Sequence, residues 1–286
     1  MTIRGLTPDC QKNKKMRIKE KFIQLKKEGK KAFISYLCAG DPDYDTSLEV
    51  LKGLPGAGCD LIEIGVPFLD PAGDGPTIED ASKRAIGNGM NLVKTLTMLE
   101  EFRKDDLNTP VIFMTYFNPL LKYGLDKIFA DMKNAGADGV LIVDLPFEEE
   151  DEVVGFIKDV DLDFIRLVTP VTPEDRVGKI LKNASGFVYL VSMLGITGTK
   201  TAQTQDNIRH LEILRKKTDL PLAIGFGIKT PETAKEFSKI DTDGIIVGST
   251  FVKEIENSCK TNKTQDQIKQ NVLELVKKFS ESIKND

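Results

Sequence analysis

Short apolar segments with the composition of buried β-strands recur along the chain, and segments with helical periodicity alternate with them. One such helical repeat is the spacing of Leu92, Leu96 and Leu99. We predict strands over residues 32–38, 61–65, 111–116, 139–144, 164–169, 187–192, 222–226 and 244–248. Eight alternating β/α units, with no linker of biased composition between them, favour a closed (β/α)8 barrel. An open doubly wound sheet is the alternative, but eight regular units would be long for it.

The length of the chain fits this architecture as one domain. A barrel of this kind takes about 250 residues. The chain has 286, so residues 1–286 are predicted to form a single barrel domain. The segments after the second and sixth strands are longer than simple connections require, which predicts extended loops there. In such a barrel these loops lie at the carboxyl-terminal face, where active sites are built.

Both ends of the chain carry amphipathic segments. Near the start, Ile18, Phe22 and Leu25 recur at helical spacing within a lysine-rich stretch, which predicts an extra helix before the first strand. We interpret its basic residues as a solvated face, because no further basic run extends them toward a nucleic-acid or membrane surface. Near the end, the spacing of Ile268 and Val272 predicts a helix that closes the outer ring.

The composition argues against several classes of site. The net charge is -4, and Cys10, Cys38, Cys59 and Cys259 form no CxxC pair, which suggests neither a zinc site nor a disulfide framework. His210 is the only histidine and lies in a polar segment, which disfavours a Ser-His-Asp triad. No apolar run approaches the roughly 18 residues of a membrane span, and the start lacks the apolar core of a signal peptide. We therefore predict a cytoplasmic protein with no metal site and no nucleic-acid or membrane partner.

One predicted strand carries a carboxylate inside its apolar run. Glu63 lies in the second strand, where an ionised acid must be paired, protonated or turned toward a cavity. The loop that follows holds Asp70 and Asp74 among glycines and prolines typical of turns. Carboxylates at a strand end and on the loop beyond it can face one pocket, which is the arrangement that general acid/base catalysis uses.

Glycine-rich turns follow three late strands, at residues 195–199, 225–228 and 248–250. Each turn can bring backbone N–H groups close to a phosphate. The third runs directly into a helical segment and adds the hydroxyl group of Ser249. A single glycine-rich turn is weak evidence, but three of them together favour a phosphate site.

Polar and aromatic residues near other strand ends are further candidates. Tyr116 and Asp144 are predicted to end the third and fourth strands, and Tyr189 lies in the sixth. Asp41 fits a helix cap or turn former better than a catalytic group. Five residues could wall a flat aromatic ligand, although core packing alone would explain them: Tyr36, Ile78, Met114, Leu141 and Phe226.

Seven segments together resemble a known family in order and spacing. They are AFISYLCAGDP (32–42), LIEIGVPFLDPAGDGPTIE (61–79), MTYFNP (114–119), IVDLPFEE (142–149), YLVSMLGITG (189–198), GFGI (225–228) and GIIVGS (244–249). The resemblance is to tryptophan synthase alpha chains, and it spans nearly the whole chain from Ala32 onward. It implies a (β/α)8 barrel that cleaves indole-3-glycerol phosphate to indole and glyceraldehyde 3-phosphate, with neither cofactor nor metal in this chain. It also implies a pyridoxal-phosphate beta chain as partner, in an αββα complex that receives the indole through a tunnel.

The resemblance also implies roles for single residues. Glu63 matches the catalytic acid/base of the family, and Asp74 matches its second catalytic carboxylate. The residues implied to hold the substrate phosphate are Gly198, Phe226, Gly227, Gly248 and Ser249. Those implied to surround the indole and glycerol parts are Tyr36, Ile78, Met114, Tyr116, Leu141, Tyr189, Thr197 and Ile246.

Three residues depart from the family pattern and bear on loop closure and partner contact more than on bond cleavage: Leu69, Gly73 and Met193. Two alternatives keep the family likeness, namely a stand-alone lyase that releases free indole and a weakly catalytic barrel that acts mainly as an allosteric partner. A third is an isomerase of histidine synthesis, which would carry paired carboxylates on the first and fifth strands. The predicted fifth strand, 164–169, contains no acid.

Overall fold

The computed structural model describes residues 16–192 and 200–284. Parallel strands in this part of the chain close into one barrel, in which each strand pairs with the next in sequence and β8 pairs with β1. The strands are β1 (Ala32–Cys38), β2 (Leu61–Gly65), β3 (Val111–Thr115), β4 (Gly139–Ile142), β5 (Asp163–Val168), β6 (Val188–Val191), β7 (Leu222–Gly225) and β8 (Gly244–Val247). The predicted (β/α)8 barrel is therefore confirmed, and the open doubly wound sheet is wrong.

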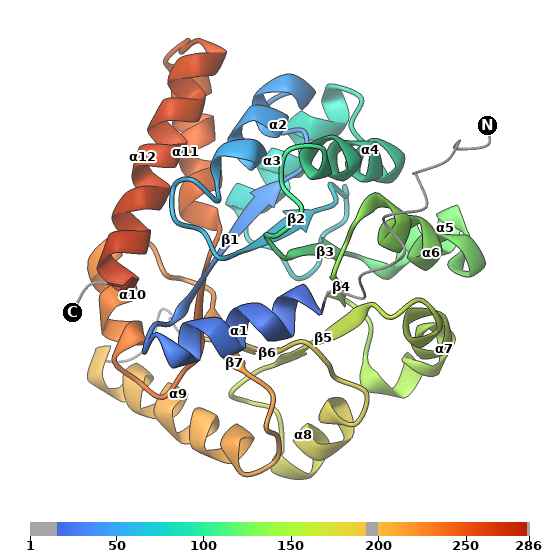
Figure 1. Ribbon diagram of the computed structural model, residues 1–286, viewed down its shortest axis with the longest axis vertical. Helices are drawn as coiled ribbons and strands as arrows, with labels where there is room; N and C mark the ends of the chain where they lie inside the picture. Colours follow the sequence, from blue (N-terminus) through green and yellow to red (C-terminus); the bar gives the residue numbers. More distant parts are fainter. Residues whose placement is uncertain (1–15, 193–199, 285–286) are drawn as a thin grey trace.

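Helices surround the barrel on all sides (Figure 1). In chain order they are α1 (Arg17–Lys27), α2 (Tyr44–Gly53), α3 (Pro76–Gly87), α4 (Leu92–Arg103), α5 (Phe117–Tyr123), α6 (Leu125–Ala135), the short 3-10 helix η2 (Phe147–Glu149), α7 (Asp151–Asp159), α8 (Glu174–Leu181), α9 (Lys200–Arg215), α10 (Pro231–Ser238), α11 (Ser249–Lys260) and α12 (Gln265–Lys284). The last of these packs against α2, α10 and α11, as predicted for a helix that closes the outer ring. No helix in the described ranges is long and apolar enough to cross a membrane.

Several predicted strands extend too far at their carboxyl ends. Tyr116 lies just after β3, where it is the residue that precedes α5. Asp144 lies beyond β4, and its Oδ1 atom accepts a hydrogen bond of 2.7 Å from the N–H of Phe117 at the start of α5. Both side chains therefore belong to the loops above the barrel. The fifth strand begins one residue earlier than predicted, at Asp163, but this acid lies at the amino end of the barrel, away from those loops.

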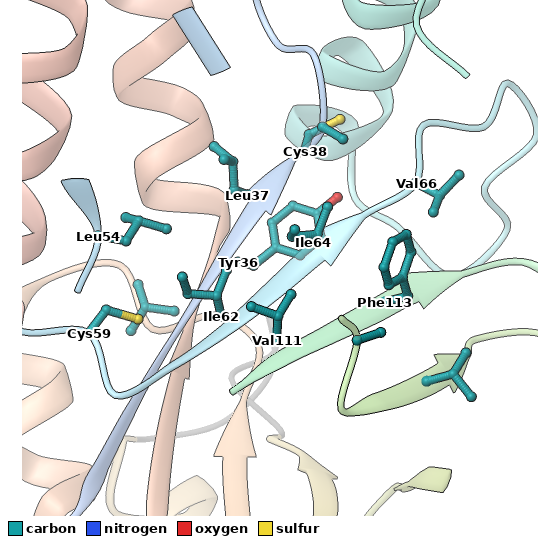
Figure 2. Packing of buried hydrophobic residues seen from close by; sticks show 14 of the residues in the cluster. Tyr36, Leu37, Cys38, Leu54, Cys59, Ile62, Ile64, Val66, Val111 and Phe113 are labelled. Atoms are coloured by element: carbon teal, nitrogen blue, oxygen red, sulfur yellow. The ribbon is translucent and has the colours of Figure 1, made fainter. Parts of the chain in front are cut away.

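Two apolar layers stabilise the barrel. Alternate strand residues point outward to the helices, and Figure 2 shows part of this outer layer with Leu37, Ile62, Ile64, Val111 and Phe113 from the first three strands. The others point inward and fill the barrel interior, as is usual for barrels of eight strands.

Helix α1 closes the amino end of this interior. Its apolar face, formed by Ile18, Phe22 and Leu25, is buried in the same cluster as the inward strand residues, and the Phe22 ring centroid lies 5.8 Å from that of Phe187. Figure 1 shows α1 crossing the middle of the ring of helices. The extra amino-terminal helix is confirmed. Lys19, on its polar face, is exposed, as predicted for a solvated basic face.

Side chains at the same amino end fasten the strands in pairs. A polar residue just before each even-numbered strand accepts the N–H of a residue in or beside the preceding odd-numbered strand, at distances of 2.7 to 2.9 Å. The acceptors are Asp60, Asp138, Ser185 and Asp243, and the donors are Phe33, Val111, Phe164 and Leu222. These bonds stabilise the end of the barrel that lies opposite the long loops.

Candidate active site

Glu63 lies in the middle of β2, and its side chain faces the barrel interior. Leu61, two residues earlier on the same face, belongs to the interior cluster with Ile34 and Ile112. Only 1% of Glu63 is exposed, and its Oε1 atom has no hydrogen-bond partner. Burial raises the pKa of Glu63 to about 8, so its carboxyl group holds a proton at neutral pH.

Two buried tyrosines lie near Glu63, and two glycines make room for them. A Cβ atom on Gly65 would collide with the hydroxyl of Tyr36, and one on Gly225 would collide with that of Tyr189. Burial raises the pKa of both phenols well above the usual value, and the nearby Glu63 raises it further. Both tyrosines therefore stay protonated and contribute neutral hydroxyl groups to the interior.

Asp74 lies on the loop between β2 and α3, above the mouth of the barrel. Burial raises its pKa to about 6, and a hydrogen bond from the Tyr116 hydroxyl opposes this rise by stabilising the ionised carboxylate. The same hydroxyl accepts a hydrogen bond of 3.1 Å from the N–H of Gly73. A Cβ atom at position 73 would lie 2.6 Å from Cγ1 of Val143, so glycine lets this loop approach the end of β4. Tyr116 and Gly73 together hold Asp74 over the barrel.

The two carboxyl groups differ in charge at neutral pH. The pKa of Glu63, about 8, keeps it mostly protonated, whereas that of Asp74, about 6, keeps it mostly ionised. Two acids with separated pKa values can act as a proton donor and as an anion in the same pocket. The described part of the chain contains no cluster of His, Cys, Asp or Glu that could hold a metal ion. The two carboxyl groups themselves are suited to proton transfer and to electrostatic stabilisation of a positive charge.

The turn after β7 has an unusual backbone. Phe226 has a φ of 80° and Gly227 a φ of 73°, both in the left-handed region that an aromatic residue rarely adopts. Ser192, at the end of β6, holds this turn: its N–H donates to the carbonyl of Gly225 at 2.7 Å, and its hydroxyl donates to the carbonyl of Phe226. Strain of this kind is typical of functional sites and persists only when the surroundings enforce it.

The amino end of α11 lies beside β1, at the same end of the barrel. The helix begins at Ser249, and its N-cap residue, Gly248, provides no side-chain hydrogen bond to the first turn. A Cβ atom on Gly248 would lie 2.8 Å from Cβ of Tyr36, so glycine permits this close approach. The positive end of the helix dipole and free backbone N–H groups at such a terminus favour an anion such as a phosphate.

The sequence matches a known protein family over nearly the whole chain. The sequence model described as tryptophan synthase alpha chain matches residues 22–284. The chain belongs to this family. The match covers every strand of the barrel and nearly all of its helices, so the tryptophan synthase alpha chain resemblance seen in the sequence is confirmed.

Solved structures agree with this tryptophan synthase alpha chain assignment. The subunit alpha of tryptophan synthase from Legionella pneumophila str. Paris is 34% identical, with 93% of this chain and 98% of that chain covered and a TM-score of 0.86. A structure from Aquifex aeolicus VF5 is also 34% identical, with coverages of 94% and 99% and a TM-score of 0.84. An aminoacrylate-bound tryptophan synthase from M. tuberculosis is 28% identical, with coverages of 94% and 99% and a TM-score of 0.82.

The structure brings together many of the residues predicted for a tryptophan synthase alpha chain site. Leu141, Tyr189 and Ile246 belong to the interior cluster, and Met114 packs against it. Ile78 instead lies in the first turn of α3 and packs against the outer layer.

Phe226 is 43% exposed. Thr197, Gly198 and Met193, the last of which departs from the family pattern, fall outside the described residues.

Asp41 is buried, and its carboxylate accepts hydrogen bonds of 2.8 and 3.0 Å from the guanidinium of Arg84 on α3. The residue that caps α2 is Asp43.

Two features of the site were missed in the sequence. Tyr116 was predicted to contact the indole, and its hydrogen bonds to Gly73 and Asp74 were not foreseen. Ser192 was not predicted at all, because nothing in its neighbourhood indicates a bond to a carbonyl 34 residues away. Only contacts between segments far apart in the sequence reveal these roles.

Proposed function

We propose that this tryptophan synthase alpha chain cleaves indole-3-glycerol phosphate by a retro-aldol reaction, giving indole and glyceraldehyde 3-phosphate in L-tryptophan biosynthesis. The observation that carries the proposal is Glu63, a buried and protonated carboxyl group with one unpartnered oxygen inside the barrel. A proton donor in an apolar pocket is what the reaction needs, because the indole ring becomes a leaving group only when its C3 atom is protonated.

Proton transfer by Glu63 opens the reaction. Its proton goes to indole C3, which leaves a positive charge on the ring nitrogen and an ionised Glu63. A base then takes the proton of the glycerol C3′ hydroxyl, and ionised Glu63 can serve as that base. The bond between C3 and C3′ breaks, its electrons return to the ring, and an aldehyde forms at C3′. Glu63 ends the cycle protonated, and no external acid is consumed.

Asp74 stabilises the intermediate charge. Its carboxylate accepts a hydrogen bond from the indole N–H, where positive charge develops once C3 is protonated. Its lowered proton affinity relative to Glu63 keeps it ionised when the reaction needs an anion. The hydroxyl of Tyr116 supports this state, since its hydrogen bond lowers the pKa of Asp74.

The phosphate end of the substrate is assigned to the turns after β7 and β8. Phe226 and Gly227 would present backbone N–H groups from the strained turn, and Gly248 and Ser249 would do so from the start of α11. Gly198 is assigned to the same group. Tyr36, Ile78, Met114, Tyr116, Leu141, Tyr189, Thr197 and Ile246 are assigned to the indole and glycerol parts.

The proposal extends to the assembly. We expect a beta chain that carries pyridoxal phosphate as partner, in an αββα tetramer, with no cofactor in this chain and a cytoplasmic location. The tryptophan synthase structures from M. tuberculosis support a beta partner, and Leu69, 60% exposed on the loop that holds Asp74, offers apolar surface for contact.

Indole release from indole-3-glycerol phosphate tests this function. The purified chain should release indole slowly, and an added beta chain should raise the rate. Glu63→Gln should lose about 10² to 10⁴ of the rate, the usual contribution of general acid/base catalysis. Asp70→Asn is the matched control, since Asp70 is an exposed acid on the same loop as Asp74. Rapid release without a partner would indicate a stand-alone lyase, and no release under any condition would refute the function.

A further inference from the structure

A cavity of about 270 Å³ lies where β4 and β5 separate. The pairing of these strands stops at Leu141 and Ile165, whereas β5 continues to Val168 in register with β6. Above this point β4 and β5 are no longer paired, and the cavity is lined by residues of both the interior cluster and the outer layer. Its apolar lining consists of Ile142, Val143, Leu145, Ile165, Leu167 and Ile180.

Arg166 lines the outer side of this cavity and is only 5% exposed. Its Nε–H has no hydrogen-bond partner, although a guanidinium carries five N–H donors that are costly to bury unsatisfied. The closest carboxylate is that of Glu150, whose Oε2 atom lies 3.6 Å from Nη2, too far for a good hydrogen bond, and is itself without a partner. The guanidinium also lies 4.6 Å from the ring centroid of Phe164. Arg166 is therefore a buried cation with unused donor capacity.

The other charged groups around the cavity are already engaged. Arg176 forms a bidentate ion pair with Glu148, and its guanidinium lies 4.5 Å from the ring centroid of Phe147. Asp144, which is exposed at the mouth, accepts the N–H of Phe117. Of the polar groups that line the cavity, the Nε–H of Arg166 is thus the buried donor that lacks a partner.

We propose that this cavity is a binding site for a small carboxylate with an apolar body. Its carboxylate oxygens would accept hydrogen bonds from Arg166, and its body would lie between the apolar residues of β4, β5 and α8. The volume is slightly below the roughly 300–1,000 Å³ of pockets for drug-sized ligands, so a molecule with one six-membered ring fits. This cavity borders the proposed active site, because Val143 lines it and also approaches Gly73 on the loop that holds Asp74. Its proposed carboxylate-binding group is nevertheless Arg166, and it uses neither Glu63 nor Asp74.

Benzoate and its neutral isostere benzamide test the site by calorimetric titration of the full chain. Benzoate should bind saturably and about ten- to hundredfold more tightly than benzamide, because a charge-assisted hydrogen bond to arginine is stronger than a neutral one. Replacing Arg166 alone would leave the buried Glu150 carboxylate without its nearest cation, so the test variant is the double change Arg166→Met with Glu150→Gln. A second variant, Ile180→Phe, fills the cavity and leaves Arg166 in place.

Both variants should weaken benzoate binding at least tenfold while their thermal unfolding stays cooperative. The controls are Lys182→Met, which removes an exposed cation at the end of α8, and Glu63→Gln, which alters the barrel interior. Both controls should bind benzoate as the unchanged chain does. The proposal is overturned if benzoate does not bind, if benzamide binds equally well, if the double variant retains full binding, or if Glu63→Gln abolishes it.

Discussion

Removal of one hydroxyl, in Tyr116→Phe, should change the pH dependence of indole release. Tyr116 is 3% exposed, and its hydroxyl joins Gly73 and Asp74. In the unchanged chain the rate should rise as Asp74 ionises near pH 6 and fall as Glu63 loses its proton near pH 8. The profile is therefore bell-shaped, and each limb reports one carboxyl group.

Loss of the hydroxyl should move only the acid limb. The hydrogen bond from Tyr116 lowers the pKa of Asp74, so its loss raises that pKa further. A hydrogen bond to a charged group contributes about 1.5–3 kcal/mol, and 1.36 kcal/mol equals one pKa unit. Because Asp74 is only partly buried, solvent screening reduces this value, and we expect a shift of about one pH unit. The rate at pH 6 should then fall about fivefold, with little change near pH 8.

The assay is indole release by Tyr116→Phe between pH 5 and pH 9, with Tyr123→Phe as the matched control. Tyr123 also donates to a carboxylate, that of Asp131 at 2.6 Å, but on α5 and away from the barrel interior. The control should keep both limbs of the profile. An unmoved acid limb in Tyr116→Phe, or an equal loss of rate at every pH, would refute the role assigned to Tyr116.

Three further predictions concern stability and substrate binding. The pKa of Glu63 is raised from 4.5 to about 8 on folding, so its burial costs stability increasingly as pH rises between these values, by about 1.4 kcal/mol per pH unit. Glu63→Gln should therefore be more stable than the unchanged chain at pH 8 in urea unfolding, and the difference should shrink toward pH 5. Ser192→Ala should release the strained turn at Phe226 and raise KM about five- to tenfold with a smaller change in kcat, as steady-state kinetics would show. Phe22→Ala should cost about 3–5 kcal/mol of unfolding free energy, whereas Ile23→Ala, at an exposed position on the same helix, should change it by about 0.5 kcal/mol or less.

Local pattern was sufficient to predict the barrel and its central acids. The first two strands were predicted with their observed bounds, because turn residues end both apolar runs. Glu63 stood out because an acid inside a buried strand needs a physical reason. Tyr116 and Asp144 were wrongly placed in strands, since β-propensity does not show that the chain has already turned toward α5.

Other features depend on contacts that no local pattern contains. The close approach of Gly73 to Val143 and the bond from Ser192 to the turn after β7 both join segments far apart in the sequence. Arg166 illustrates the same limit, because its alternation with apolar neighbours does not reveal that its Nε–H lacks a partner. The alternation of apolar residues predicts which face of a strand is buried. The residues that each buried side chain contacts are known only once the barrel is closed.

The central claim is that Glu63 carries the proton to and from indole C3, and isotope exchange tests it most directly. Indole and glyceraldehyde 3-phosphate are incubated with the chain in deuterated water, and the C3 position of indole is followed by proton NMR. Repeated condensation and cleavage should place deuterium at C3 with the unchanged chain and with Asp70→Asn, and Glu63→Gln should leave C3 unlabelled. Labelling of C3 by Glu63→Gln at the rate of the unchanged chain would contradict the account.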